Sequence, residues 1–279
     1  MIRYTIALLP ALLLLLLQQP TVSLFTFIVL GQGHFLLTYL YQFRAGKITR
    51  TYLLWYAIVS LLVFSAATYL PFSLMLVTAA SIFAVHYIYD EARLLIGENL
   101  RLSLSLITPP MLFFMAYLLY QQYAIDLFPA CVLLSLFLVL RSWYSYGARH
   151  LAAPYVLLTN VITAIMLGLY FTDTIVPSEL LLGAIIIHHY GTWYVFQYVK
   201  LRSSPTRLGV YLTDVLAVNA ILLFAFLIYL TSGGGTWLQY VFAESYFYAW
   251  TILHIVFASH DLLAALGQRA RSYRYLLGS

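Results

Sequence analysis

The sequence predicts an all-α membrane protein: a polytopic transmembrane bundle of about ten helices with both termini in the cytoplasm. Hydrophobic residues make up 63% of the 279-residue chain and charged residues only 8%, whereas soluble domains carry about 25% charged residues. The apolar residues gather in windows of about 20 residues, the length that crosses a hydrocarbon core. Little sequence lies outside these windows, so we expect one integral membrane domain over residues 1–279.

Charges, prolines and glycines interrupt the apolar windows and set the expected helix ends. Gln18-Gln19-Pro20 closes the first window, a basic loop follows the second, and Pro71 opens the fourth. A Ser-Ser-Pro-Thr loop follows the eighth window, and a run of three glycines separates the ninth from the tenth. In chain order the expected helices are 2–18, 21–43, 51–70, 72–96, 102–123, 126–147, 155–175, 177–200, 208–231 and 239–266.

The basic residues test this division of the chain. All 14 Lys and Arg residues fall on one side of the predicted membrane, which is the cytoplasmic side by the positive-inside rule. Both termini then lie in the cytoplasm, and we expect a multi-pass protein of the inner (cytoplasmic) membrane. The number of spans must be even: ten, or eight if the first or fifth segment does not cross. The basic residues are Arg3, Arg44, Lys47, Arg50, Arg93, Arg101, Arg141, Arg149, Lys200, Arg202, Arg207, Arg269, Arg271 and Arg274.

The charge and the cysteine count exclude several functions. Topology accounts for the net charge of +5, so nucleic acid is not an expected partner. The single cysteine, Cys131, excludes a disulfide within the chain and any cysteine-based zinc or iron–sulfur site. Metal chemistry in this protein must therefore use histidine and carboxylate ligands.

Six histidines lie at similar depths on even-numbered predicted helices, all of which run toward the cytoplasm. At 1.5 Å per residue they lie roughly 10 to 22 Å from the cytoplasmic charges. Imidazole is costly to place in hydrocarbon, so each such histidine needs a partner or a function. The shared depth predicts a buried metal site. The candidate ligands are His34, His86, His188, His189, His254 and His260.

Three aspartates are candidate catalytic residues beside these histidines. Asp90 lies four residues after His86, and Asp261 seven after His254, so each pair shares a helix face. Asp214 enters at a matching depth from the predicted ninth helix. A carboxylate near an imidazole can bind the same ion or orient the ring.

The adjacent His188 and His189 point about 100° apart around a helix, so they cannot both face one centre without distortion. We expect one of the two to bind metal, with His189 nearer the common depth, and the other to orient it or meet substrate. Gly31 and Gly33, just before His34, would allow another helix to approach closely.

These features favour a membrane-embedded non-haem iron oxygenase that oxidises a lipid or isoprenoid with dioxygen. Iron accepts imidazole and carboxylate ligands and keeps open positions for dioxygen and substrate. The HxxxH and HxxHH boxes of fatty-acid desaturases and hydroxylases are absent from the sequence.

The order of these residues resembles the Brp/Blh family of bacterial and archaeal β-carotene 15,15'-dioxygenases. The likeness rests on the early His34, on His86 with Asp90, and on the later pair His188 and His189. It concerns residue type and order from about residue 30 to 190. It implies a helical membrane enzyme whose transmembrane histidines hold iron, and which cleaves a central polyene double bond with dioxygen.

Two other functions fit the same residues. A b-type cytochrome would clamp haem b between histidines on facing helices, and a proton or metal transporter would use the buried His and Asp residues as a relay. A rhodopsin-like photoreceptor is disfavoured, because the only lysines, Lys47 and Lys200, lie at helix ends.

Overall fold

A computed structural model describes residues 20–96, 100–146, 168, 178–233 and 236–258. The elements in these ranges are all helical, so the expected all-α fold is confirmed. The expected helices 2–18 and 155–175 lie outside the described residues, as do both termini.

The long helices begin and end within three residues of their expected bounds. The shift is largest at the start of α10, where Pro205 occupies the first turn; proline suits that position because its missing N–H needs no partner there. The long helices are α2 (Pro20–Arg44), α3 (Arg50–Tyr69), α4 (Phe72–Ile96), α5 (Leu100–Tyr123), α6 (Phe128–Tyr146), α9 (Ser178–Leu201) and α10 (Pro205–Thr231).

The expected helix over 239–266 is wrong at its start, where two helices replace one. The short α11 (Gln239–Phe242) ends at Ala243, whose backbone is extended, and α12 (Glu244–Ala258) begins at the next residue. A helix end leaves carbonyl groups without partners inside the helix. Here side chains supply the donors: Gln32 Nε2 donates to the Val241 carbonyl at 2.9 Å, and Trp250 Nε1 to the Tyr240 carbonyl at 2.9 Å.

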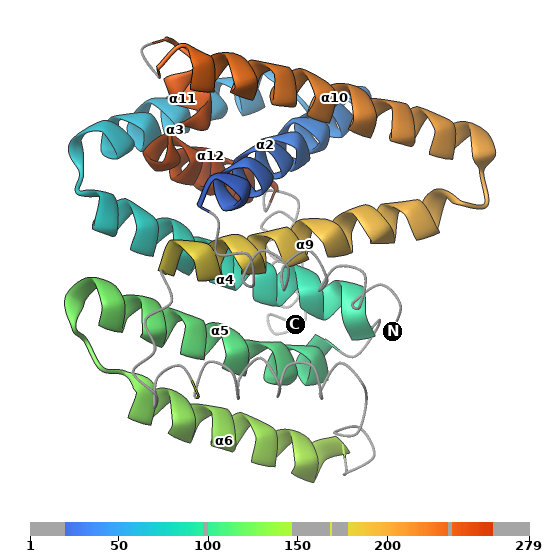
Figure 1. Cartoon of the computed structure of the whole chain (residues 1–279). Coiled ribbons are helices and arrows are strands. Elements are labelled where there is room, and N and C mark those ends of the chain that lie inside the picture. Colours follow the sequence, from blue (N-terminus) through green and yellow to red (C-terminus); the bar gives the residue numbers. More distant parts are fainter. Residues whose placement is uncertain (1–19, 97–99, 147–167, 169–177, 234–235, 259–279) are drawn as a thin grey trace, which may run out of the picture.

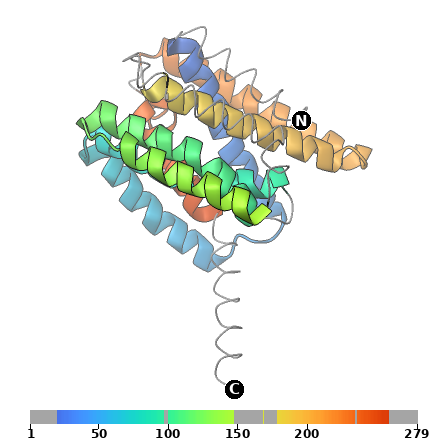
Figure 2. The same cartoon turned by 90° about the horizontal axis from the view of Figure 1, so that it is seen from below.

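The α12 helix is the centre of one half of the bundle. It packs against α2, α3 and α4, and nine of its residues are buried, including Phe247, Thr251 and His254. On its other side α4 packs against α5, and α5 against α6, with α9 lying across α2 and α4 (Figures 1 and 2). Three helices from the early part of the chain therefore surround α12.

Four of the described helices are long and apolar enough to cross a membrane. These segments are Arg50–Tyr69, Phe72–Asp90, Phe128–Ser145 and Pro205–Thr231. Most of their surface faces outward, as expected of lipid-facing helices: on α10 only 17% of the most apolar window is buried. The helical bundle is thus a membrane protein by length and composition.

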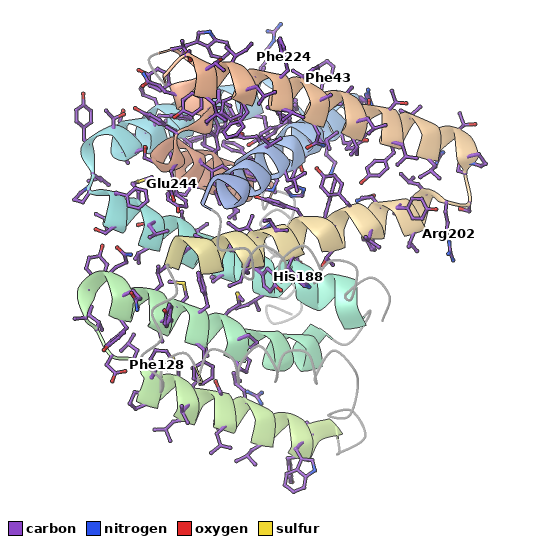
Figure 3. The ribbon with its side chains drawn as sticks, in the orientation of Figure 1. Phe43, Phe128, His188, Arg202, Phe224 and Glu244 are labelled. Atoms are coloured by element: carbon purple, nitrogen blue, oxygen red, sulfur yellow. The ribbon has the colours of Figure 1, made fainter. Side chains whose placement is uncertain are left out.

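The helix connections lie at two opposite edges of the bundle, and basic residues gather at one of them. The connections from α3 to α4 and from α5 to α6 lie at one edge, and the connection from α9 to α10 lies at the other (Figure 1). The second edge carries Lys200, Arg202 and Arg207, and Arg202 is labelled there in Figure 3. We call this edge the basic end of the bundle.

Candidate metal centre

Four imidazole rings from four helices form a closed ring inside the bundle. They belong to His34 on α2, His86 on α4, His189 on α9 and His254 on α12. The ring centroids are 4.8 Å apart between His34 and His254, and 5.9 Å apart between His254 and His86. They are 5.4 Å apart between His86 and His189, and 6.0 Å apart between His189 and His34. Residues up to 220 positions apart in the sequence thus surround one point.

Helical periodicity directs each histidine inward. On α4 the buried Ala79 and Phe83 are followed by His86 and Asp90 at three- and four-residue steps, which keeps them on one face. On α12 the same steps connect Phe247, Thr251 and His254, all buried. The apolar faces that build the core therefore carry the imidazoles into it.

The spacing of the rings approaches that of ligands around one metal ion, and among the described residues the ligand atoms of His86, Asp90 and His189 already lie close enough to hold one. A metal–imidazole bond is about 2.1 Å long, so rings that share one ion have centroids about 5 Å apart. The observed distances of 4.8–6.0 Å come close to this value, and side-chain rotation would supply the rest. The neutral imidazole that binds metal is also the form that an apolar interior favours.

Ring nitrogens on α2 and α12 lack a hydrogen-bond partner among the described residues. They are Nδ1 of His34 and Nδ1 of His254, both buried in side chains that are 3% exposed. A buried polar atom without a partner costs about 1–3 kcal/mol. A metal ion would give such a nitrogen a partner, so these atoms support a ligand in the cluster.

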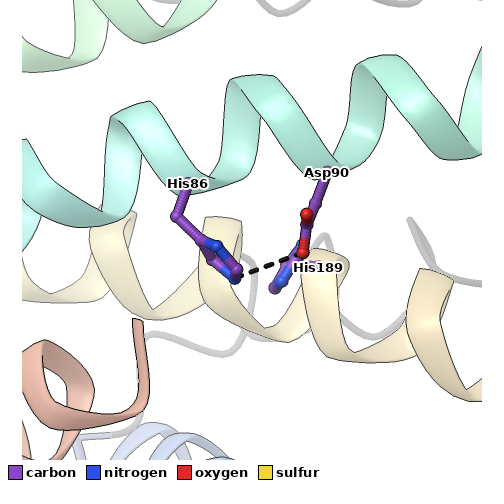
Figure 4. A group of neighbouring side chains, drawn as sticks. All are labelled: His86, Asp90 and His189. Atoms are coloured by element: carbon purple, nitrogen blue, oxygen red, sulfur yellow. Dashed lines mark ion pairs between the residues drawn. The ribbon is translucent and has the colours of Figure 1, made fainter. Parts of the chain in front are cut away.

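Asp90 adds a carboxylate at one side of the cluster. Its Oδ2 lies 3.3 Å from Nε2 of His86, and His189 joins the pair from the facing helix (Figure 4). One ligand atom from each of the three residues lies within 4.8 Å of the others. Asp90 can therefore either bind the ion directly, or hold Nε2 of His86 and so orient the ring with Nδ1 left for the ion.

His188 points away from this cluster. Its Nδ1 lies 3.1 Å from the hydroxyl of Tyr87, with which it shares a hydrogen bond, and Figure 3 places it on α9 beside α4. The geometry thus separates the adjacent histidines, as expected from the 100° step along a helix, and places His189 among the other three rings.

Aromatic side chains close the site on the α2 side. The indole of Trp193 packs edge-on against His34 with centroids 4.6 Å apart, and Phe35 stacks on His254 at 4.5 Å. Trp193 is not among the site residues predicted from the sequence. Its position four residues after His189 on one helix was the available signal, because that spacing places both on the same face.

The remaining site residues predicted from the sequence are Asp214, His260 and Asp261. Asp214 forms an ion pair with Arg44, whose Nη2 donates to Oδ1 at 3.0 Å, and accepts a hydrogen bond from the Tyr41 hydroxyl at 3.2 Å. It therefore joins the end of α2 to α10, and its catalytic role stays a prediction. His260 and Asp261 lie outside the described residues.

Gly31 sets how closely α2 approaches α12 and α9. A Cβ at this position would lie 2.7 Å from the ring of Phe247 and 3.0 Å from the Tyr190 hydroxyl. Phe247 is fully buried, so its ring has little room to move. A Cβ at Gly33 would lie 2.5 Å from Oδ1 of Asn219, a short side chain on α10.

We expect Gly31→Ala to destabilise the protein by about 1–3 kcal/mol, the usual cost of overpacking, and to move His34 away from the other rings. Gly209→Ala is the matched control, because nothing lies within 4 Å of a Cβ there. That change should stabilise α10 by up to about 1 kcal/mol. Thermal unfolding of both variants in one detergent tests this, and equal melting temperatures would contradict the close approach.

Comparison with known proteins gives no relative from which to transfer a function: no family model, curated protein or solved structure matches the chain. The conclusions about the site therefore rest on its own residues, which include a His/Asp group able to hold a metal ion.

Proposed function

We propose that the protein is a membrane-embedded non-haem iron oxygenase that uses dioxygen to oxidise an apolar lipid or isoprenoid. One observation carries this proposal: four buried imidazoles from four helices surround one point, with a carboxylate beside them. The resemblance to the β-carotene dioxygenases rests on three of these imidazoles, on the adjacent His188 and on Asp90, and it agrees with a long apolar substrate.

The donor set suits iron better than the ions that prefer other ligands. Calcium and magnesium prefer oxygen ligands. Zinc also accepts imidazole and carboxylate, so the metal content of the protein must distinguish it from iron. Ferrous iron accepts imidazole with carboxylate and leaves coordination positions open. When bound, iron would supply the activation of dioxygen.

The residues of the chain would bind and position the ion and exclude water. His34, His86, His189 and His254 would hold the ion, and Asp90 would hold the His86 ring or complete the ligand set. The side chains of Phe35 and Trp193 cover the α2 side with apolar surface. Such a dry, apolar setting suits both a hydrocarbon substrate and the protection of a reactive centre.

Haem b fits this arrangement less well than a single ion. A haem needs two imidazoles on opposite faces and an open plane between them for the porphyrin. In the cluster each ring has two other imidazole rings within 6.0 Å, so histidines occupy the space of that plane.

The proposal is tested by the metal content and the visible spectrum of the detergent-purified protein. We expect about one iron per chain and no Soret band, together with dioxygen uptake when an isoprenoid such as β-carotene is added. A Soret band would establish the cytochrome instead. Stoichiometric zinc, or no metal at all, would refute the oxygenase and favour the proton or metal transporter.

A further inference from the structure

Polar side chains between α2, α9 and α10 extend from the basic end of the bundle toward the histidine cluster. Asp214 accepts a hydrogen bond from the Tyr41 hydroxyl at 3.2 Å. The ring of Tyr41 stacks on that of Tyr211 with centroids 6.4 Å apart. Tyr194 follows on α9, beside Tyr211 and Asn219. We call these five residues, Tyr41, Tyr194, Tyr211, Asp214 and Asn219, the polar seam.

Three atoms of the polar seam are buried and have no hydrogen-bond partner among the described residues. They are the hydroxyl oxygens of Tyr194 and Tyr211 and Oδ1 of Asn219. Asn219 lies beside Tyr194 without forming a hydrogen bond to it. Buried polar groups in proteins are nearly always hydrogen-bonded, either to other protein groups or to bound water. These three atoms therefore indicate that the polar seam binds a small polar ligand.

The inner end of the polar seam lies against Gly33, one residue before His34. A Cβ at Gly33 would lie 2.5 Å from Oδ1 of Asn219, so the glycine leaves the room that this amide occupies. Asn219 follows Tyr211 by eight residues on α10, which places it roughly 12 Å farther along the helix. The polar seam thus reaches from the basic end to the edge of the histidine cluster.

The outer end of the polar seam lies at a pocket with a volume of about 620 Å³. This pocket is formed by the last turns of α2 and α9 and the first turns of α10, and both Tyr41 and Tyr211 line it. Thr38, Gln42 and Gln197 add uncharged polar groups to its wall. One water molecule takes up about 30 Å³ in the liquid, so the pocket has room for several and can supply the polar seam with water.

We propose that a file of bound water fills the polar seam and carries protons between the basic end and the edge of the histidine cluster. Water suits this place because hydroxyl groups and an amide oxygen need a ligand that both donates and accepts hydrogen bonds. Each water molecule takes up a proton on one side and releases one on the other, so no group is oxidised or reduced. The path stands on the polar seam itself; the use of its protons at the metal centre rests on the proposed function.

The test places a carboxyl group at the inner end of the path, by Asn219→Asp in the full-length protein in nanodiscs. The two side chains have nearly the same size, so the change conserves the packing against Gly33. At mildly acidic pH the infrared band of the protonated carboxyl, taken as variant minus wild type, shifts when deuterium replaces the proton. We expect this shift within seconds of mixing with D₂O. A band that needs minutes or longer to shift would overturn the proposal.

Two tyrosine substitutions, each combined with Asn219→Asp, show whether protons enter from the basic end. Tyr211→Phe removes a hydroxyl from the path and should slow the exchange by about tenfold, the effect on a rate of losing roughly one hydrogen bond. Tyr248→Phe is the matched control: Tyr248 is 1% exposed and Tyr211 4%, but the Tyr248 hydroxyl donates to Glu244 at 3.0 Å, outside the polar seam. Equal exchange rates in the two double variants would contradict the path.

Radiolytic footprinting of the wild-type protein gives a second measurement that needs no substitution. X-ray pulses generate hydroxyl radicals from water, and bound water modifies the buried side chains next to it. Mass spectrometry should find Tyr211 modified several-fold faster than Tyr248, although both side chains are buried. If the two tyrosines are modified equally slowly, the polar seam holds no water and the proposal fails.

Iron content, measured on every preparation, separates this path from the proposed function. Fast exchange that depends on Tyr211 in a protein without iron would uphold the path and refute the oxygenase. Stoichiometric iron in a protein whose introduced carboxyl exchanges only slowly would refute the path and leave the oxygenase standing.

Discussion

Replacing His189 by alanine is expected to lower the iron affinity more than about 100-fold, whereas His188→Ala keeps iron at the wild-type level. Loss of a partner outside the ligand set already costs about 10- to 100-fold in metal affinity, and loss of a ligand should cost more. His189 lies 5.4 Å from His86 and 6.0 Å from His34 between ring centroids. His188 instead shares its hydrogen bond with Tyr87.

The two variants are closely matched. Both positions are buried histidines on α9, 1% and 6% exposed, so truncation removes the same volume from the same helix. Iron per chain is measured after purification and after titration of the apoprotein with ferrous iron. If His188→Ala loses iron as fully as His189→Ala, while both variants elute as monodisperse protein, the assignment of the adjacent pair is wrong.

The sequence predicted the helices well because each is a long apolar window with a charged or proline boundary. The break at Ala243 was missed, because no proline or charge precedes it within 239–243. One of the two side chains that stabilise it is distant in the sequence: Gln32, more than two hundred residues away, donates to the Val241 carbonyl. A contact of this kind leaves no signal in the local sequence.

The depth of the histidines could be predicted from the sequence, but their directions could not. Distance from the basic residues follows from the rise per residue, and His34, His86, His189 and His254 do come together at one level of the bundle. The direction of a side chain also depends on how each helix is rotated in the bundle. Asp214 shows the difference: its oxygens accept hydrogen bonds from Arg44 and Tyr41 near the end of α2.

Gly31 and Gly33 show how the sequence and the site are connected. The two glycines allow α2 to approach α12, α9 and α10 within the reach of their side chains, and His34 directly follows Gly33. All four rings belong to helices that contact α2 or α12 directly. The close packing at Gly31 therefore helps to set how closely His34 on α2 approaches the rings on α9 and α12.

Removing the metal is expected to destabilise the whole bundle. The four histidines connect α2, α4, α9 and α12, so an ion that binds only the folded form stabilises their assembly. At a free-ion concentration about 1,000 times the dissociation constant this stabilisation is about 4 kcal/mol. For a protein of this size each kcal/mol shifts the melting temperature by about 2–4 °C. Chelation of iron should therefore lower the melting temperature by roughly 10 °C, measured by tryptophan fluorescence in detergent.

The variant His254→Ala distinguishes metal linkage from a direct effect of the chelator. It removes the ring that lies 4.8 Å from His34, so its melting temperature should be low and should not respond to chelation. The variant His188→Ala, which keeps the cluster, should respond to chelation as the wild type does. Readdition of ferrous iron should then restore the melting temperature of the wild type and of His188→Ala. A wild-type protein that loses its iron without any change in melting temperature would show that the ion does not connect the helices, because an ion held by residues of four helices cannot leave without loosening their packing.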